Sequence, residues 1–266
     1  MRRHVTTSAW NKFRDGDHRE APMWELYHEN SKISRFDSRI SEEAVVAQMS
    51  RLSETLYFPG YPHIPLPPWS PATLTMSVGE AVQMRRSSRE SGDNPISIGQ
   101  ISSILAAAYG VTRGPDPATS RSQRSVPSAG ALYPLEMFVS LDRSDTGLSG
   151  LFHYNSILHE LTQIRSDSQR ELLADCLTQP ELCSAFPMFV FITAIFERSI
   201  FKYADRGYRF SLIEAGHVGQ NISMACTSLD LGSLNIGGFF DREMDKYLNL
   251  DGITQSTIYV AGVGTK

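Results

Sequence analysis

The sequence predicts an α+β fold, and three observations lead to that prediction. Short runs rich in Val, Ile and Phe have the length of single β-strands. One long segment, 211–231, instead repeats apolar residues every three or four positions, as an amphipathic helix does. Strands and helices alternate without the regular spacing of βαβ units, which favours an α+β arrangement over a doubly wound parallel sheet.

The composition excludes several classes of function. The chain has 266 residues and a formal net charge of −4, with 25 Lys and Arg against 29 Asp and Glu, so it lacks the basic surplus of a nucleic-acid-binding protein. A hydrophobic fraction of 41% is typical of a globular chain rather than a disordered one. No stretch approaches the ~18 apolar residues of a membrane span, and no apolar segment follows the basic N-terminus. We therefore expect a cytoplasmic protein with no membrane role.

The cysteines also point to the cytoplasm. Cys176, Cys183 and Cys226 lie in or near apolar runs, without CxxC spacing or a neighbouring His cluster. This pattern indicates buried thiols in a reducing compartment, and we expect no metal site.

A proline-rich segment divides the chain. Six of the 14 prolines fall within residues 59–71. Because proline fixes φ and lacks an N–H donor, this segment should be extended and stay out of the centre of a sheet. A helix is predicted before it, at 41–56. We predict an N-terminal extension with a proline-rich linker at 1–70 and a main domain at 71–266.

The elements of the main domain follow from local signals. Ser97 and Gln100 have the spacing of a capping box, and the helix they open should end at a left-handed Gly110. The polar residues 112–125 predict a loop. The other expected elements, in chain order, are strands at 136–141, 151–154 and 188–196, the long helix at 211–231 ended by Gly232, a helix from Asp241 and a strand at 257–261.

Four segments contain residues suited to binding or chemistry, and each also has an ordinary structural interpretation. Residues 85–89 (RRSSR) suit a phosphate group, or form a solvated basic turn. Residues 127–134 (PSAGALYP) form a stiff loop that suits a planar ring, or a tight connection into a strand. Residues 232–239 (GSLNIGGF) present Gly-Gly N–H groups to an acceptor, or form a turn or bulge.

The fourth segment, 201–209 (FKYADRGYR), holds an isolated lysine. Only five of the 25 cationic residues are Lys, and Lys202 is the only one between Lys32 and Lys246. A lysine desolvated beside a cleft has a lowered pKa and can act as a general base near neutral pH. The alternative is a surface lysine beside a packing tyrosine, Tyr203.

Taken in order, these segments resemble the nitroreductase-type flavoproteins, and within them the SagB-type dehydrogenases of azole-containing peptide biosynthesis. The resemblance covers residues 73–264 and includes the oxidase component of microcin-type thiazole/oxazole synthetases, which shows a similar FKY…RGYR run. Residues 24–32 (WELYHENSK) also resemble the start of SagB-type chains. This resemblance implies a central, mainly antiparallel sheet flanked by helices, with FMN bound at a homodimer interface.

The resemblance also implies roles for individual residues. Lys202 would be the general base and Tyr203 its proton-donating or relaying partner. The implied contacts of the FMN phosphate and ribityl chain are Arg85, Arg86, Ser87 and Arg89, with Lys266 as a further phosphate ligand. The implied contacts of the isoalloxazine ring are Ser128, Ala129, Gly130, Ala131 and Leu132 from the other subunit, and the N–H groups of Gly237 and Gly238.

The implied activity is FMN-dependent dehydrogenation of peptide thiazolines and oxazolines to thiazoles and oxazoles, during biosynthesis of a ribosomally made modified peptide. The implied partners are a second copy of the chain, an azoline-containing precursor peptide and the cyclodehydratase subunits of a synthetase. Two alternatives stay open. One is an NAD(P)H-dependent nitro- or quinone reductase, which needs no Lys-Tyr pair, and the other is an FMN-binding scaffold subunit that docks synthetase partners.

Overall fold

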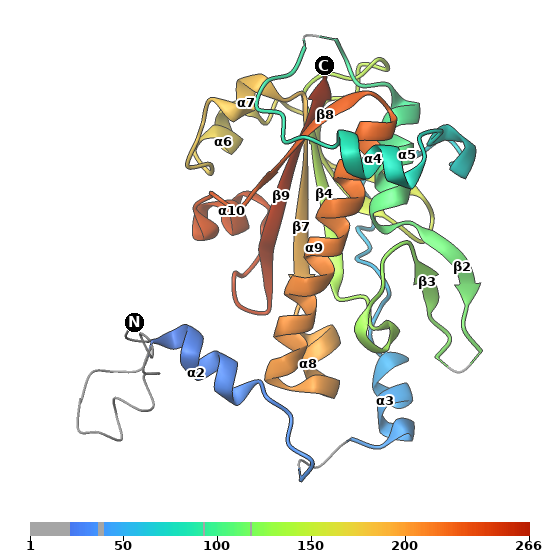
Figure 1. The fold of residues 1–266 in the computed structure, drawn as a ribbon, viewed down its shortest axis with the longest axis vertical. Helices are drawn as coiled ribbons and strands as arrows, with labels where there is room; N and C mark the ends of the chain where they lie inside the picture. The colour runs from blue at the N-terminus through green and yellow to red at the C-terminus, as the bar shows by residue number, and fades with distance from the viewer. Residues whose placement is uncertain (1–21, 37–39, 93, 118) are drawn as a thin grey trace, which may run out of the picture.

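A computed structural model describes residues 22–36, 40–92, 94–117 and 119–266, arranged around one large sheet (Figure 1). The α-helices are α2 (Met23–Asn30), α3 (Glu42–Met49), α4 (Val78–Met84), α5 (Ile98–Tyr109), α6 (Arg170–Ala174), α7 (Leu182–Ala185), α8 (Glu197–Tyr203), α9 (Asp205–Ser228) and α10 (Asp241–Tyr247). The strands are β1 (His63–Pro65), β2 (Val111–Pro115), β3 (Ser122–Arg124), β4 (Leu135–Leu141), β5 (Gly150–Asn155), β6 (Glu160–Arg165), β7 (Met188–Ile195), β8 (Leu231–Ile236) and β9 (Gln255–Thr265).

The large sheet is antiparallel throughout its described strands. Its order is β1-β6-β5-β4-β7-β9-β8. Strands β2 and β3 form a separate hairpin. The predicted α+β class, with a mainly antiparallel sheet flanked by helices, is therefore confirmed.

Apolar cores lie on both faces of the sheet. Helices α5 and α9 cover one face, where Ile104, Val218 and Val190 are completely buried. Helices α6, α7 and α10 cover the other face, where Phe191 and Met244 belong to a second core. Because both faces are covered, strands such as β4 and β7 are almost continuously apolar, which is why they were recognisable in the sequence.

Two helix boundaries differ from the sequence prediction. The helix expected at 41–56 ends at Met49, because the Arg121 guanidinium binds the carbonyl groups of Met49 and Leu52 and closes the helix there. The long helix spans Asp205–Ser228 rather than 211–231. Its exit passes through Asp230, at φ 56°, and Leu231 and Gly232 already pair with β9.

The region after α5 was also predicted incorrectly. The capping box of Ser97 and Gln100 is present, but Gly110 is extended (φ −68°) rather than left-handed, because the chain continues directly into β2. The segment 112–125, expected to be a loop, contains most of the β2–β3 hairpin. Its strands are short and largely polar, so their sequence lacks a strand pattern.

The proline-rich linker stays out of the centre of the sheet, as predicted, but it contributes a short strand at the edge. Residues His63–Pro65 form β1 at the end of the sheet, and Leu66 is buried in the core. The division into 1–70 and 71–266 stays a prediction. All three cysteines are buried free thiols. Among the described residues, no helix is long and apolar enough to cross a membrane.

Candidate active site

The Lys202–Tyr203 pair forms the last turn of α8, immediately before a sharp turn into α9. Ala204 makes this turn at φ 47°, ψ −139°, a conformation that costs a non-glycine residue about 1–3 kcal/mol and that often occurs at functional sites. The two helices pack so closely that a Cβ on Gly207 would lie 2.8 Å from the backbone of Ile200. The pair is therefore held by backbone packing rather than by a free loop.

The loop 128–133 faces this pair. Gly130, Ala131 and Tyr133 all have positive φ, and the Tyr133 N–H donates to Ser128 Oγ at 2.9 Å. A Cβ placed on Gly130 would lie 2.7 Å from Tyr203 Oη and 2.8 Å from Lys202 Nζ. The structure thus brings the predicted ring-binding loop and the predicted catalytic pair into direct contact.

A pocket of about 910 Å³ opens beside the pair. We call it the α3 pocket. One side comes from the N-terminal segment, through Ile33, Ile40, Val45, Val46 and Met49. The other side comes from residues later in the chain, namely Gly130, Ile200, Phe201, Lys202 and Tyr203. Such a volume suits a small ligand or part of a larger one.

The predicted phosphate-binding residues lie elsewhere, along the start of β8. Ser87 forms a β-bridge with Ser233, and the Ser88 N–H donates to the Ser233 carbonyl at 2.9 Å. The C-terminal residue Lys266 is also here, with its Nζ 2.7 Å from Asp230 Oδ1. The structure therefore groups residues 85–89 with Lys266, and their role in phosphate binding stays a prediction.

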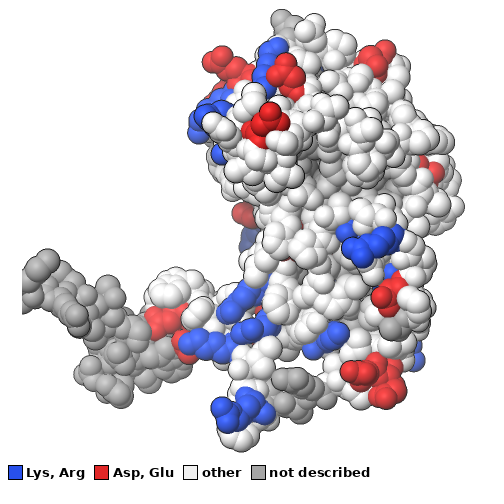
Figure 2. All heavy atoms as spheres, turned by 45° about the vertical axis from the view of Figure 1, so that its right-hand side comes forward, with Lys and Arg blue, Asp and Glu red and all other residues white. Residues whose placement is uncertain are grey.

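The arginines of this group are available to an anion. Within the described part of the chain, none of Arg85, Arg86 and Arg89 has a carboxylate partner, and Arg86 donates to the carbonyl groups of Gln83 and Arg85. On the face shown in Figure 2, Lys and Arg lie in separate groups interspersed with Asp and Glu. Anion binding would therefore depend on a local cluster rather than on a broad positive surface.

The Gly237–Gly238 segment lies just after β8. A Cβ on Gly237 would meet no atom within 4 Å, and the Gly238 carbonyl accepts from Thr178. Neither glycine N–H has an acceptor within the described residues. These N–H groups are free to bind a ligand atom.

One chain does not bring all the predicted residues together. The Lys202–Tyr203 pair precedes the first turn of α9, and the cluster of 85–89 with Lys266 lies beyond its last turn (Figure 1). The helix has 24 residues, which is about 36 Å at 1.5 Å per residue. A ligand shorter than this distance cannot contact both groups of one chain.

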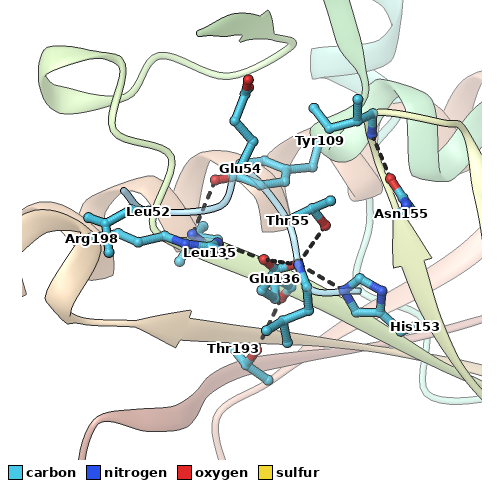
Figure 3. A network of polar contacts seen from close by, with 12 residues as sticks. Leu52, Glu54, Thr55, Tyr109, Leu135, Glu136, His153, Asn155, Thr193 and Arg198 are labelled. Carbon is cyan, nitrogen blue, oxygen red and sulfur yellow. Dashed lines mark hydrogen bonds and ion pairs between the residues drawn. The ribbon is translucent and has the colours of Figure 1, made fainter. Parts of the chain in front are cut away.

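A buried ionic network supports α8 and was not anticipated from the sequence (Figure 3). Glu136 of β4 accepts from Arg198 Nη1 at 2.6 Å and lies 2.8 Å from His153 Nε2. It also accepts from the Thr55 hydroxyl and the Leu56 N–H. Burial alone would raise the pKa of Glu136, but Arg198 and His153 outweigh burial and lower the pKa to about 2. The sequence did contain a signal for this network, because Glu136 is a charged residue within the apolar run of β4, and buried charges are ordinarily paired.

A second buried carboxyl group lies behind the 128–133 loop. Glu214 of α9 accepts from the Tyr109 hydroxyl at 2.7 Å. Burial raises the pKa of Glu214 to about 7, against the opposing effect of its polar neighbours Ser128 and Tyr109. The sequence prediction missed this residue because a single Glu on a helix is ordinarily solvent-exposed, and only the packing of α9 against α5 buries it.

The fold and the sequence together define the class of this protein. The sequence model of the nitroreductase family matches residues 82–265, and the chain belongs to this family of oxidoreductases. A protein of Anabaena variabilis described as a nitroreductase has the same fold, with a TM-score of 0.69 at 22% identity over 94% of this chain and 49% of that one. A further family structure, from Desulfovibrio desulfuricans, contains FMN; its TM-score is 0.50 at 17% identity, over 71% of this chain and 86% of that one.

Particular relatives include peptide-processing proteins. The microcin B17-processing protein McbC of Escherichia coli is 30% identical over 64% of this chain, and the trifolitoxin-processing protein TfxB of Rhizobium leguminosarum is 28% identical over 85%. The chain spans 63% and 61% of their lengths. A nitroreductase-type protein of Methanocaldococcus jannaschii is 36% identical over 62% of this chain and 81% of its own length. The E. coli microcin synthetase McbBCD complex, solved with truncated pro-MccB17, contains a similar fold (TM-score 0.57, 23% identity, 92% of both chains).

Proposed function

We propose that this protein oxidises peptide thiazolines and oxazolines to thiazoles and oxazoles, using FMN, during biosynthesis of a ribosomally made modified peptide. The observation that carries this proposal is the close approach of Lys202 Nζ and Tyr203 Oη to Gly130, where even a Cβ atom would collide with them. An NAD(P)H-dependent reductase of the same family needs no such pair. Similarity to two peptide-processing proteins favours the same conclusion.

The reaction defines what the pair has to do. An azoline becomes an azole by losing a proton from Cα and a hydride from Cβ. When bound, FMN supplies the hydride acceptor. Lys202 would take the proton from Cα at Nζ, and Tyr203 would relay that same proton onward through Oη. The ammonium that forms lies near the face of Tyr203, with Nζ 5.3 Å from the ring centroid, where the aromatic face stabilises it.

The described residues fit FMN. Arg85, Arg86, Ser87 and Arg89 would hold the phosphate and ribityl chain, with Lys266 as a further cation. Ser128, Ala129, Gly130, Ala131 and Leu132 would line the isoalloxazine ring. The free N–H groups of Gly237 and Gly238 would donate to the ring edge.

The proposed site needs a homodimer, because the phosphate-binding cluster and the 128–133 loop lie beyond opposite ends of α9. The outer face of α9 supports such contact, since Leu212 and Ile213 are 38% and 50% exposed. We further propose that the dimer works with an azoline-containing precursor peptide and with cyclodehydratase subunits. The similarity to a chain of the microcin synthetase complex supports this assembly.

The test is mass spectrometry of an azoline peptide incubated with the FMN-loaded protein. The proposal predicts a loss of two hydrogens per ring, about 2 Da. Lys202→Ala should lower turnover by about 10²–10⁴-fold with FMN content unchanged, as expected for loss of a general base. Near wild-type turnover of this variant would show that Lys202 is not the base. Rapid NAD(P)H oxidation with small nitro compounds and no peptide oxidation would favour the reductase instead.

A further inference from the structure

The α3 pocket joins the catalytic pair to a segment outside the matched family region. Residues 33–49 precede the family match, which begins at residue 82. We infer that α3 is a specificity wall, which binds an apolar side chain next to the azoline ring of the peptide substrate. This inference rests on the proposed function for the identity of the ring, and it concerns how the neighbouring residue is recognised.

The pocket is lined by both polar and apolar side chains. Lys202 and Tyr203 supply polar atoms beside Gly130. On the α3 side, Ile33, Ile40 and Val46 supply apolar surface next to the Glu42 carboxylate. Ile33 is 51% exposed and Val46 is 45% exposed, so this apolar surface is accessible to a ligand. A ligand that contacts both the catalytic pair and these apolar side chains carries a polar reacting ring and an adjacent apolar group. A peptide with an aliphatic or aromatic residue beside the ring has this chemistry.

The wall is fixed relative to the catalytic loop. Val45 and Met49, on the inner side of α3, are buried against Leu132, which belongs to the 128–133 loop two residues after Gly130. The guanidinium of Arg121, the residue just before β3, binds the carbonyls at the end of α3, with Nη2 2.6 Å from the Leu52 oxygen. Because these contacts order the wall before any ligand arrives, burying an apolar side chain there requires little further ordering.

Binding of the reaction product tests the wall independently of turnover. Two synthetic peptides, each with one thiazole and differing only in Gly or Leu beside the ring, are titrated into the FMN-loaded full chain by fluorescence anisotropy. We expect the Leu peptide to bind about tenfold more tightly than the Gly peptide, from burial of its side chain. Val46→Trp, which fills the pocket, should remove this difference.

The matched control is Ala47→Trp. Ala47 is exposed on the same helix and does not line the α3 pocket, so this variant should keep the tenfold preference. Thermal unfolding of both variants checks that the fold is intact. Equal binding of the two peptides to the wild type, or equal loss of preference in both variants, would overturn the inference. The inference would also be overturned if Val46→Trp changed the oligomeric state of the protein but kept the preference for the Leu peptide. That result would mean that the pocket is a contact between copies of the chain.

This experiment also separates the inference from the proposed function. A preference for the Leu product that Val46→Trp abolishes supports the wall even if no azoline is oxidised. Oxidation of both corresponding azoline peptides, without any binding preference, supports the proposed function and rejects the wall.

Discussion

Arg198 Nη1 lies 2.6 Å from Glu136 Oε1, and both side chains are almost completely buried. This contact ties α8 to the centre of the sheet, one helical turn before Lys202. Glu136 in turn holds Thr55 and Leu56, which lie just beyond the N-terminal helix α3. A single carboxylate therefore fixes the positions of both the candidate catalytic helix and the segment that follows the pocket wall.

Removing one partner of this pair should be strongly destabilising. Arg198→Met removes the positive charge beside the buried Glu136 carboxylate. We therefore expect a loss of about 3–5 kcal/mol in the free energy of unfolding. Urea denaturation measures this loss. The control is Arg170→Met, which breaks the partly exposed pair with Asp142 and should cost no more than ~1 kcal/mol. Similar losses in the two variants would contradict the central role of Glu136.

Glu214 should make the protein less stable as the pH rises toward neutrality. Its folded-state pKa, about 7, is above the ordinary value of 4.5, so between these values the folded state binds more protons than the unfolded state. The contribution of Glu214 to the free energy of unfolding is therefore greatest below pH 4.5. About 3 kcal/mol of this contribution is lost as the pH rises through 7. Unfolding free energies of the wild type and of Glu214→Gln between pH 5 and 8 test this, and parallel curves would exclude the effect.

Gly130→Ala should impair the catalytic pair more than it impairs the fold. The new Cβ would collide with Tyr203 Oη and Lys202 Nζ, and displacement of a catalytic group by about 1 Å can cost roughly 10²-fold in turnover. Gly147→Ala is the matched control, because Gly147 also has positive φ (74°) but no neighbour within 4 Å of its Cβ position. In both variants an Ala at positive φ should lower the free energy of unfolding by about 1 kcal/mol, but only Gly130→Ala should lose azoline oxidation.

The arginine cluster should determine FMN affinity. Replacing Arg85 and Arg89 with Ala removes two guanidiniums that have no carboxylate partner in the described chain, and we expect FMN to bind at least about tenfold more weakly, since charge-assisted hydrogen bonds contribute about 1.5–3 kcal/mol each. Lys266→Ala should have a smaller effect, because Lys266 Nζ is shared with Asp230. Titration by flavin fluorescence gives both affinities. Equal FMN affinity of the double variant and the wild type would place the phosphate elsewhere.

Local signals in the sequence predicted many of the elements. The capping box of Ser97 and Gln100, the apolar runs of β4 and β7 and the stripe of α9 depend on neighbours a few residues apart. Boundaries failed where a distant residue decides them. Arg121 ends α3, and pairing with β9 draws Leu231 and Gly232 into a strand. Leu212, although apolar, is partly exposed on the outer face of α9.

The sequence by itself determined the family and the residue types of the candidate site, because its four motifs are contiguous and their order is specific. Only the tertiary structure decided which of them meet. It placed Lys202 and Tyr203 against Gly130, separated them from Arg85 and Lys266 by the length of α9, and closed a pocket over the pair with α3. The physical reason is that a motif is held together by the covalent chain, whereas these contacts depend on long-range packing that no local pattern encodes.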